Sequence, residues 1–212
     1  MHSMLPLTLA AALLFGSGMT ASASDAHGHG ATAKQISNKT AETRAAMRDL
    51  WLHHVFWIRT VVVATLAKND AAMRAAEQET VANAKAIAGA IEPFYGAAAK
   101  DALFKLLAGH YGAVKAYLVA DDAASQGTAT EALTKNAEEI AVFLSKANPN
   151  LPKEAVSGLL LAHGGHHIQQ IQDLRAAKYD AEARTWGEMK AHIYAIADAL
   201  TQALAKQFAT RF

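Results

Sequence analysis

Residues 159–174 read LLLAHGGHHIQQIQDL, and the pattern in this stretch decides the fold. Its apolar residues recur at spacings of three and four, which is the periodicity of one face of an α-helix. His163 and His167 fall on that face, and its other members are Val156, Leu159, Leu160, Gln170, Ile171 and Leu174. Gly164 and Gly165 interrupt the stretch, although each glycine costs a helix about 1 kcal/mol relative to alanine. The segment is therefore predicted to be a buried helix. Helix stability alone does not explain its histidines and glycines.

Helical periodicity continues through most of the chain. Helices are predicted at 37–68, 70–92, 96–121, 129–147, 152–178 and 181–208. No stretch shows the sustained alternation of β-branched residues that a strand needs. Short connections make successive helices antiparallel neighbours. We therefore predict an all-α fold, an up-and-down helical bundle of about six helices.

Two of the predicted boundaries depend on local signals. The residue before a proline avoids the helical conformation, so Glu92-Pro93 is predicted to end the second helix. The sequence Thr128-Ala-Thr-Glu131 follows Gly127 and fits a capping box, which predicts the start of the fourth helix.

Composition restricts the classes of function. Of 212 residues, 52% are hydrophobic and 18% are charged, which is typical of a folded domain rather than a disordered chain. The net charge is +1 and there is no run of Lys or Arg, so neither nucleic acid nor an acidic membrane surface is an expected partner. The chain has no cysteine. Any transition metal must therefore be held by histidine, carboxylate or methionine.

The N-terminal residues resemble a targeting segment. Leu5–Phe15 is a short apolar stretch, and Ala21-Ser22-Ala23 offers a cleavage site for signal peptidase. We expect a signal peptide at 1–23, a flexible histidine-containing arm at 24–35 and the helical bundle domain at 36–212. The protein is then expected to be periplasmic or secreted. The most apolar later segment, Val55–Ala67, is shorter than the roughly 20 residues that a membrane span needs, and it contains Arg59.

Histidines fall on the apolar faces of several predicted helices. His54, His110 and His192 share this property with His163 and His167, so four helices each direct at least one imidazole inward. Buried imidazoles are costly without partners, and neutral imidazole is the commonest metal ligand in proteins. His163 and His167 are one turn apart, so both rings can reach one ion.

These positions predict a site for a divalent transition metal, namely zinc, nickel or copper. His163 and His167 would bind it together with a third inward histidine from another helix, which His54, His110 and His192 could each supply. Two alternatives stay open: the histidines form a hydrogen-bonded polar core, or they bind haem or another ligand. The HExxH, CxxCH and Glu-x-x-His patterns of other metal sites do not occur.

Residues 163–171, HGGHHIQQI, resemble the motif HxxxHxxQI of the DinB/YfiT-like family of metal-binding four-helix bundles. The matching positions are His163, His167, Gln170 and Ile171. The resemblance implies a divalent ion held by these two histidines and a third from an earlier helix, for which His54 is the candidate. His110 and His192 would then surround that site or form a second one. It also implies open coordination positions for water or substrate, and some members of that family are thiol transferases or hydrolases.

The chain as a whole resembles a bacterial family of exported or cell-surface helical proteins with no established function. The recurring segments are LW-x-x-HV-x-W-x-R, EPFYG, LL-x-x-H and NAEEIA-x-FL, which stand here at 50–59, 92–96, 106–110 and 136–144. This resemblance implies the fold and the location, and no activity.

Three functions follow as hypotheses: an exported protein that binds or carries a metal ion, a metal-dependent hydrolase or transferase with Glu188 as a candidate base, and a structural bundle with a hydrogen-bonded histidine core. A complete shell of histidines would favour carriage, whereas an open position beside Gly164 and Gly165 would favour catalysis. The two glycines could instead permit a close approach of a neighbouring helix. Arg59 is expected either to meet a carboxylate on a neighbouring helix or to extend to solvent.

Overall fold

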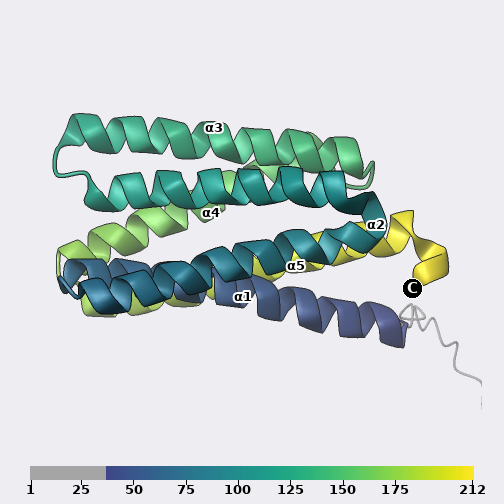
Figure 1. Ribbon diagram of the computed structural model, residues 1–212, viewed down its shortest axis with the longest axis horizontal. Helices are drawn as coiled ribbons and strands as arrows, with labels where there is room; N and C mark the ends of the chain where they lie inside the picture. The colour runs from purple at the N-terminus through teal and green to yellow at the C-terminus, as the bar shows by residue number, and fades with distance from the viewer. Residues whose placement is uncertain (1–36) are drawn as a thin grey trace, which may run out of the picture. The chain divides into compact units, whose positions relative to one another are not determined.

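The computed structural model describes residues 37–212, and the predicted signal at 1–23 and arm at 24–35 lie outside this range. The described residues contain helices and no strand, so the predicted all-α class is confirmed (Figure 1). The elements are α1 (Asn38–Leu66), α2 (Asp70–Val119), α3 (Ala123–Ala147), α4 (Lys153–Arg175), α5 (Tyr179–Gln207) and the short 3-10 helix η1 (Ala209–Arg211).

Helix α2 accounts for the difference between these five α-helices and the six that the sequence predicts. The chain passes through Pro93 in helical form and changes direction at Gly96, where φ is 81°. Glycine adopts a positive φ without the steric cost that a side chain would add. The two predicted helices at 70–92 and 96–121 are therefore the two arms of α2, which run in opposite directions (Figure 1). The predicted end at Glu92-Pro93 is wrong because the break needs the freedom of Gly96.

Helix α3 begins earlier than predicted. Its first residue is Ala123, and the Asp122 side chain caps it by accepting a hydrogen bond from the backbone N–H of Ser125 at 2.8 Å. The capping box predicted at Thr128–Glu131 is wrong, because these residues lie inside the helix. The hydroxyl of Thr128 donates to the carbonyl oxygen of Ala124, as in a helix interior. An aspartate is among the strongest N-caps, so the helix starts directly after Asp122.

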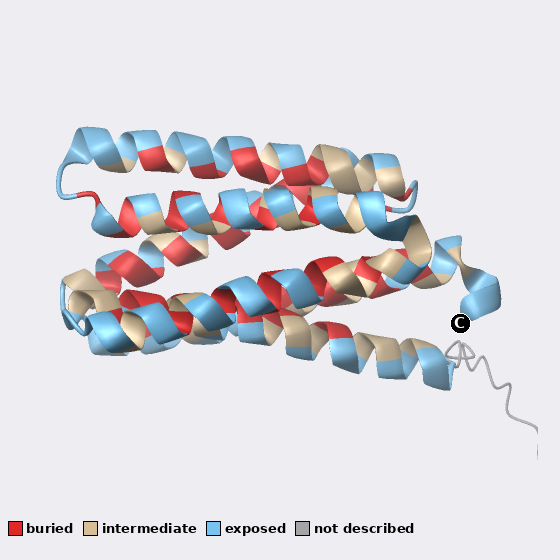
Figure 2. Ribbon diagram, in the orientation of Figure 1, coloured by how far each residue is buried: buried red, intermediate tan, exposed pale blue. Residues whose placement is uncertain are grey.

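The helices form a closed sequence of neighbours. α1 packs against α2 and α5, α2 packs against α3, and α4 packs against both α3 and α5. Smaller contacts join α4 to α1 and to α2 across the interior of the bundle. Buried residues gather on the helix faces that point inward (Figure 2).

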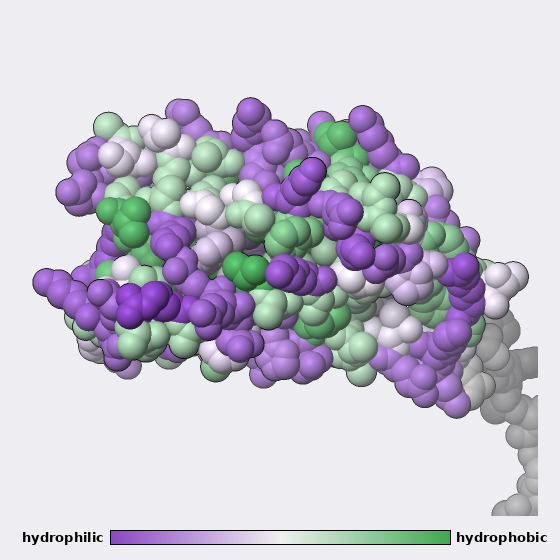
Figure 3. All heavy atoms as spheres, in the orientation of Figure 1, coloured by the Kyte–Doolittle hydropathy of each residue, from purple (hydrophilic) through white to green (hydrophobic). Residues whose placement is uncertain are grey.

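The apolar core consists of three clusters. The first joins α1, α2 and α5 around Met189, the second joins α1, α2, α3 and α4 around Ile58, and the third joins α3, α4 and the end of α5 around Ile140. Hydrophilic side chains dominate the face of the molecule seen in Figure 3. Among the described helices, none is long and apolar enough to cross a membrane.

Candidate metal centre

Four histidines from three helices come together at the centre of the bundle. His54 belongs to α1, His110 to the second arm of α2, and His163 and His167 to successive turns of α4. Each is at most 4% exposed. Their predicted inward orientation is therefore confirmed.

The positions of these histidines along their helices explain why they meet. On α1, His54 lies between Trp51 of the first apolar cluster and Ile58 of the second. On α2, His110 lies between Leu107 of the first cluster and Val114 of the second. The histidines therefore occupy the junction of the apolar clusters, where α4 approaches α1 and α2.

The ring nitrogens have the spacing of a metal site. Each of the four histidines offers one nitrogen, and these four atoms lie within 4.8 Å of one another. The Nε2 atoms of His163 and His167 are 3.1 Å apart. In a tetrahedral zinc site, Zn–N bonds of 2.0–2.1 Å place the ligand nitrogens about 3.3 Å apart. A small contraction of the group would therefore allow all four nitrogens to bind one ion.

Hydrogen bonds do not satisfy this group of histidines. The Nδ1 atoms of His54 and His163 and the Nε2 atom of His110 are buried and have no hydrogen-bond partner. A buried polar atom without a partner costs about 1–3 kcal/mol. A hydrogen-bonded histidine core would supply those partners, and here the contact between His163 and His167 is the one hydrogen bond within the group. The arrangement therefore favours a metal ion bound by the ring nitrogens over a core in which the histidines hydrogen-bond to one another.

Burial keeps all four imidazoles neutral. Desolvation, together with repulsion from His110, lowers the pKa of His54 to about 3. Desolvation also lowers the pKa of His110 to about 4, against the opposing effect of the Asn136 side chain. It lowers the pKa values of His163 and His167 well below the ordinary value, and repulsion from the neighbouring histidines adds to the effect. Neutral imidazole is the form that binds metals, so the group is ready to coordinate at neutral pH.

Each of the two glycines beside these histidines has a different environment. A Cβ atom on Gly164 would lie 3.2 Å from Cδ2 of Leu133, so this glycine permits the close approach of α3. A Cβ atom on Gly165 would meet nothing within 4 Å. A cavity of about 140 Å³ borders both glycines between α3 and α4, and none of the four histidines lines it. Open space next to the glycines therefore does not reach the imidazoles.

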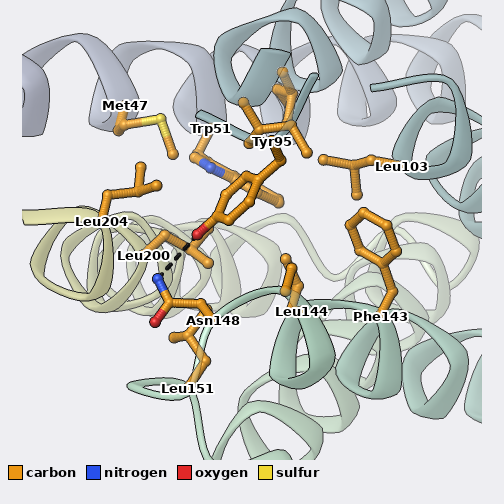
Figure 4. A pocket seen from close by; sticks show the side chains of 13 residues that line it. Met47, Trp51, Tyr95, Leu103, Phe143, Leu144, Asn148, Leu151, Leu200 and Leu204 are labelled. Atoms are coloured by element: carbon orange, nitrogen blue, oxygen red, sulfur yellow. Dashed lines mark hydrogen bonds between the residues drawn. The ribbon is translucent and has the colours of Figure 1, made fainter. Parts of the chain in front are cut away.

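A second cavity, of about 40 Å³, lies beside the turn of α2 and the connection between α3 and α4 (Figure 4). It is mostly apolar, and the Asn148 amide donates a hydrogen bond of 3.0 Å to the Tyr95 hydroxyl at its edge (Figure 4). Trp51 lines this cavity and packs edge-on against His54, with ring centroids 5.8 Å apart. None of the four histidines lines the cavity either.

The five histidines predicted as a metal site divide into a group of four and a separate residue. His192 lies outside the group, where its Nε2 atom is 2.8 Å from the carbonyl oxygen of Leu159. His110, which the sequence assigns to the surroundings of a three-histidine site, belongs to the central group. The signal that could have placed it there is its position on an inward face, equivalent to that of His54. Glu188, the candidate base, is exposed and stands outside the group.

Arg59 meets a carboxylate on a neighbouring helix, which confirms the first of the two expectations for it. Its Nε and Nη2 atoms donate to the two carboxylate oxygens of Glu182 at 2.6 and 2.8 Å. The amide of Gln170 donates to the same carboxylate at 3.0 Å. Arg59 lowers the pKa of Glu182, so this buried carboxylate stays ionised. Gln170 thus ties α4, one turn beyond His167, to α1 and α5.

Comparisons with family models, with curated proteins and with solved structures find no match to this chain.

Proposed function

We propose that this protein binds one divalent transition-metal ion in a closed site formed by His54, His110, His163 and His167. The observation that carries this proposal is the group of four buried imidazoles, each with one ring nitrogen within 4.8 Å of the others. The three buried ring nitrogens without hydrogen-bond partners support it. Binding an ion offsets the cost of burying these groups.

The chemistry of the ligands narrows the choice of metal. Four neutral nitrogen ligands suit zinc, copper and nickel, whereas calcium and magnesium prefer oxygen. The ligands come from three helices, and two of them stand on successive turns of α4. Four nitrogen ligands complete the usual tetrahedral shell of zinc, so zinc is the ion we propose.

A complete shell of protein ligands favours holding the ion over catalysis. Catalytic zinc sites have three protein ligands and an open position for water, whereas closed sites have four. The DinB-like motif implies three histidines, and His110 supplies a fourth here. Neither cavity near the site is lined by any of the four histidines. We therefore propose that the protein retains the ion, as a structural centre and a metal-holding protein of the exported compartment, and is not a hydrolase or transferase.

Thermal unfolding of the untagged protein tests this function. Zn²⁺ should raise the melting temperature relative to protein in EDTA, because a ligand at 1,000 times its Kd stabilises the native state by about 4 kcal/mol. His167→Leu should reduce the difference between zinc and EDTA, because it removes one of the four ligands. The matched control is His53→Leu, because His53 is exposed on α1 next to His54 and should leave the response unchanged. Identical melting of the unmodified protein in zinc and in EDTA would contradict the proposal.

A further inference from the structure

The proposed site raises the question of how an ion reaches it. All four ligands are buried, and the cavities on either side of them end at other residues. Two further histidines lie beside the site at the surface between α4 and α5. His166 of α4 and His192 of α5 are both partly exposed, and their ring centroids are 5.3 Å apart.

These two residues connect the surface to the buried group. The ring of His192 lies 6.5 Å from the ring of His163, and their planes are nearly parallel at 14°. The ring of His163 is in turn 4.5 Å from that of His167. The four imidazoles therefore form a continuous series from solvent to the centre of the bundle, with no step between centroids longer than 6.5 Å.

The hydrogen bond of His192 leaves one of its nitrogens ready to bind a metal. A carbonyl oxygen can only accept, so the contact of 2.8 Å with Leu159 requires that Nε2 of His192 carries the proton. The lone pair of the neutral ring is then on Nδ1. An imidazole whose far N–H is bonded to a backbone carbonyl has the arrangement usual for metal ligands.

Two imidazoles at a partly exposed position can attract and hold a divalent cation. They leave coordination positions for water, so the ion can be released again.

We propose that His166 and His192 form a surface capture site through which the metal ion passes to the buried four-histidine site by way of His163. This inference rests on the proposed function, because it assumes that the central site binds an ion. The inference adds to that function a route for the ion and a second, weaker binding site at the surface. A residue on a route speeds uptake and release equally, so removing it changes both rates and leaves the equilibrium affinity of the central site unaltered.

The test is stopped-flow uptake of Co²⁺ by the full chain, followed by its release to EDTA, with the visible absorption of nitrogen-bound cobalt as the signal. The double variant His166→Gln/His192→Gln should slow both uptake and release about tenfold, the scale on which residues supporting a metal site act. At the central site, its stoichiometry of one ion and its Kd should match those of the unmodified protein. The single variant His166→Gln, which leaves the His192 hydrogen bond to Leu159 in place, should slow both rates to a smaller extent. His53→Gln is the matched control on an exposed histidine and should have no effect.

The outcomes separate the two proposals. Unchanged rates in the double variant and in His166→Gln would overturn the capture site while the central site stands. A changed Kd in both variants would also overturn it, because these histidines would then be ligands of the central ion. Failure of the unmodified protein to bind Co²⁺ or Zn²⁺ at all would overturn the proposed function and the route together.

Discussion

A histidine buried in a helical bundle loses the hydrogen bonds that water makes to its two ring nitrogens. The loss is costly unless hydrogen-bond partners or a metal ion replace the water. In this protein four histidines are buried at one place, and three of their nitrogens have no partner among the described residues. A leucine of similar size would pack at each position without that cost. Histidine in place of an apolar residue at four buried positions on three helices therefore favours a bound ion.

Arg59 is the second residue whose burial needs a partner. Its partner Glu182 has a side chain that is 5% exposed, so removing the guanidinium leaves a buried carboxylate with the Gln170 amide as a hydrogen-bond donor but without the positive charge of Arg59. We predict that Arg59→Ala lowers the free energy of unfolding by about 2 kcal/mol, a value below that of fully buried pairs because Arg59 itself is 35% exposed. Chemical denaturation measures this loss.

Arg48→Ala is the matched control for that prediction. Arg48 also makes two hydrogen bonds to one carboxylate, that of Asp198, but at a more exposed position. Its loss should destabilise the protein less than the loss of Arg59. If the two substitutions lower the free energy of unfolding equally, the burial of Glu182 does not strengthen its ion pair with Arg59.

At the scale of the elements, the break in α2 depends on Gly96. Its φ of 81° is strained for any residue with a side chain, although a Cβ atom there would meet no neighbour. We predict that Gly96→Ala destabilises the protein by about 1–3 kcal/mol, because the combination of φ 81° and ψ 173° is one that essentially only glycine adopts. Thermal or chemical unfolding measures the change.

Gly89 lies in the first arm of α2 and provides the comparison. A Cβ atom on Gly89 would also meet nothing within 4 Å, and its backbone is helical. Gly89→Ala should therefore stabilise the protein by up to about 1 kcal/mol. If Gly96→Ala stabilises the protein as much as Gly89→Ala does, the backbone conformation at residue 96 does not require glycine, and the prediction is wrong.

Sequence periodicity predicts the helices well and their junctions less well. The spacing of apolar residues predicts the inward face of α4 and the all-α class, since burial follows directly from it. The start of α3 depends on a choice between two competing caps, Asp122 and Thr128. The turn at Gly96 depends on how the two arms of α2 pack, and Pro93 suggests a break at a nearby but different residue. Local signals of similar strength cannot rank such alternatives without tertiary contacts.

At the scale of the whole molecule, the buried histidines make stability depend on pH. The fold lowers the pKa of His54 to about 3 and that of His110 to about 4, from an ordinary value of 6.5. Between pH 6.5 and pH 4 the unfolded chain therefore binds more protons than the native protein. Stability is fully present above the unfolded pKa and declines as the pH falls below it, by about 1.4 kcal/mol per pH unit for each fully protonated histidine.

Chemical denaturation of the metal-free protein at pH 7, 6 and 5 should show this decline. The double variant His54→Leu/His110→Leu removes two of the responsible groups, so its unfolding free energy should fall less steeply over the same range. Carboxylates contribute equally in both proteins and do not affect the comparison. Parallel pH profiles for the two proteins would contradict the assignment of buried, neutral histidines.

The composition of the candidate site also shows what a sequence can predict at this scale. His163 and His167 are placed together by their spacing on one helix, whereas His54, His110 and His192 share only an inward position. Which of these three completes the group depends on the depth at which each helix packs against α4. Such depths are set by tertiary contacts, of which Gly164 against Leu133 is an example for α3 and α4, and no pattern within one helix reports them.

The central claim is that one ion is bound by four histidines, and X-ray absorption spectroscopy at the zinc edge tests it most directly. The sample is the protein prepared without an affinity tag and loaded with one equivalent of Zn²⁺. We predict a single class of site with four nitrogen ligands at about 2.0–2.1 Å and the multiple scattering that imidazole rings produce. A zinc environment dominated by oxygen, or zinc that remains free in solution, would contradict the claim.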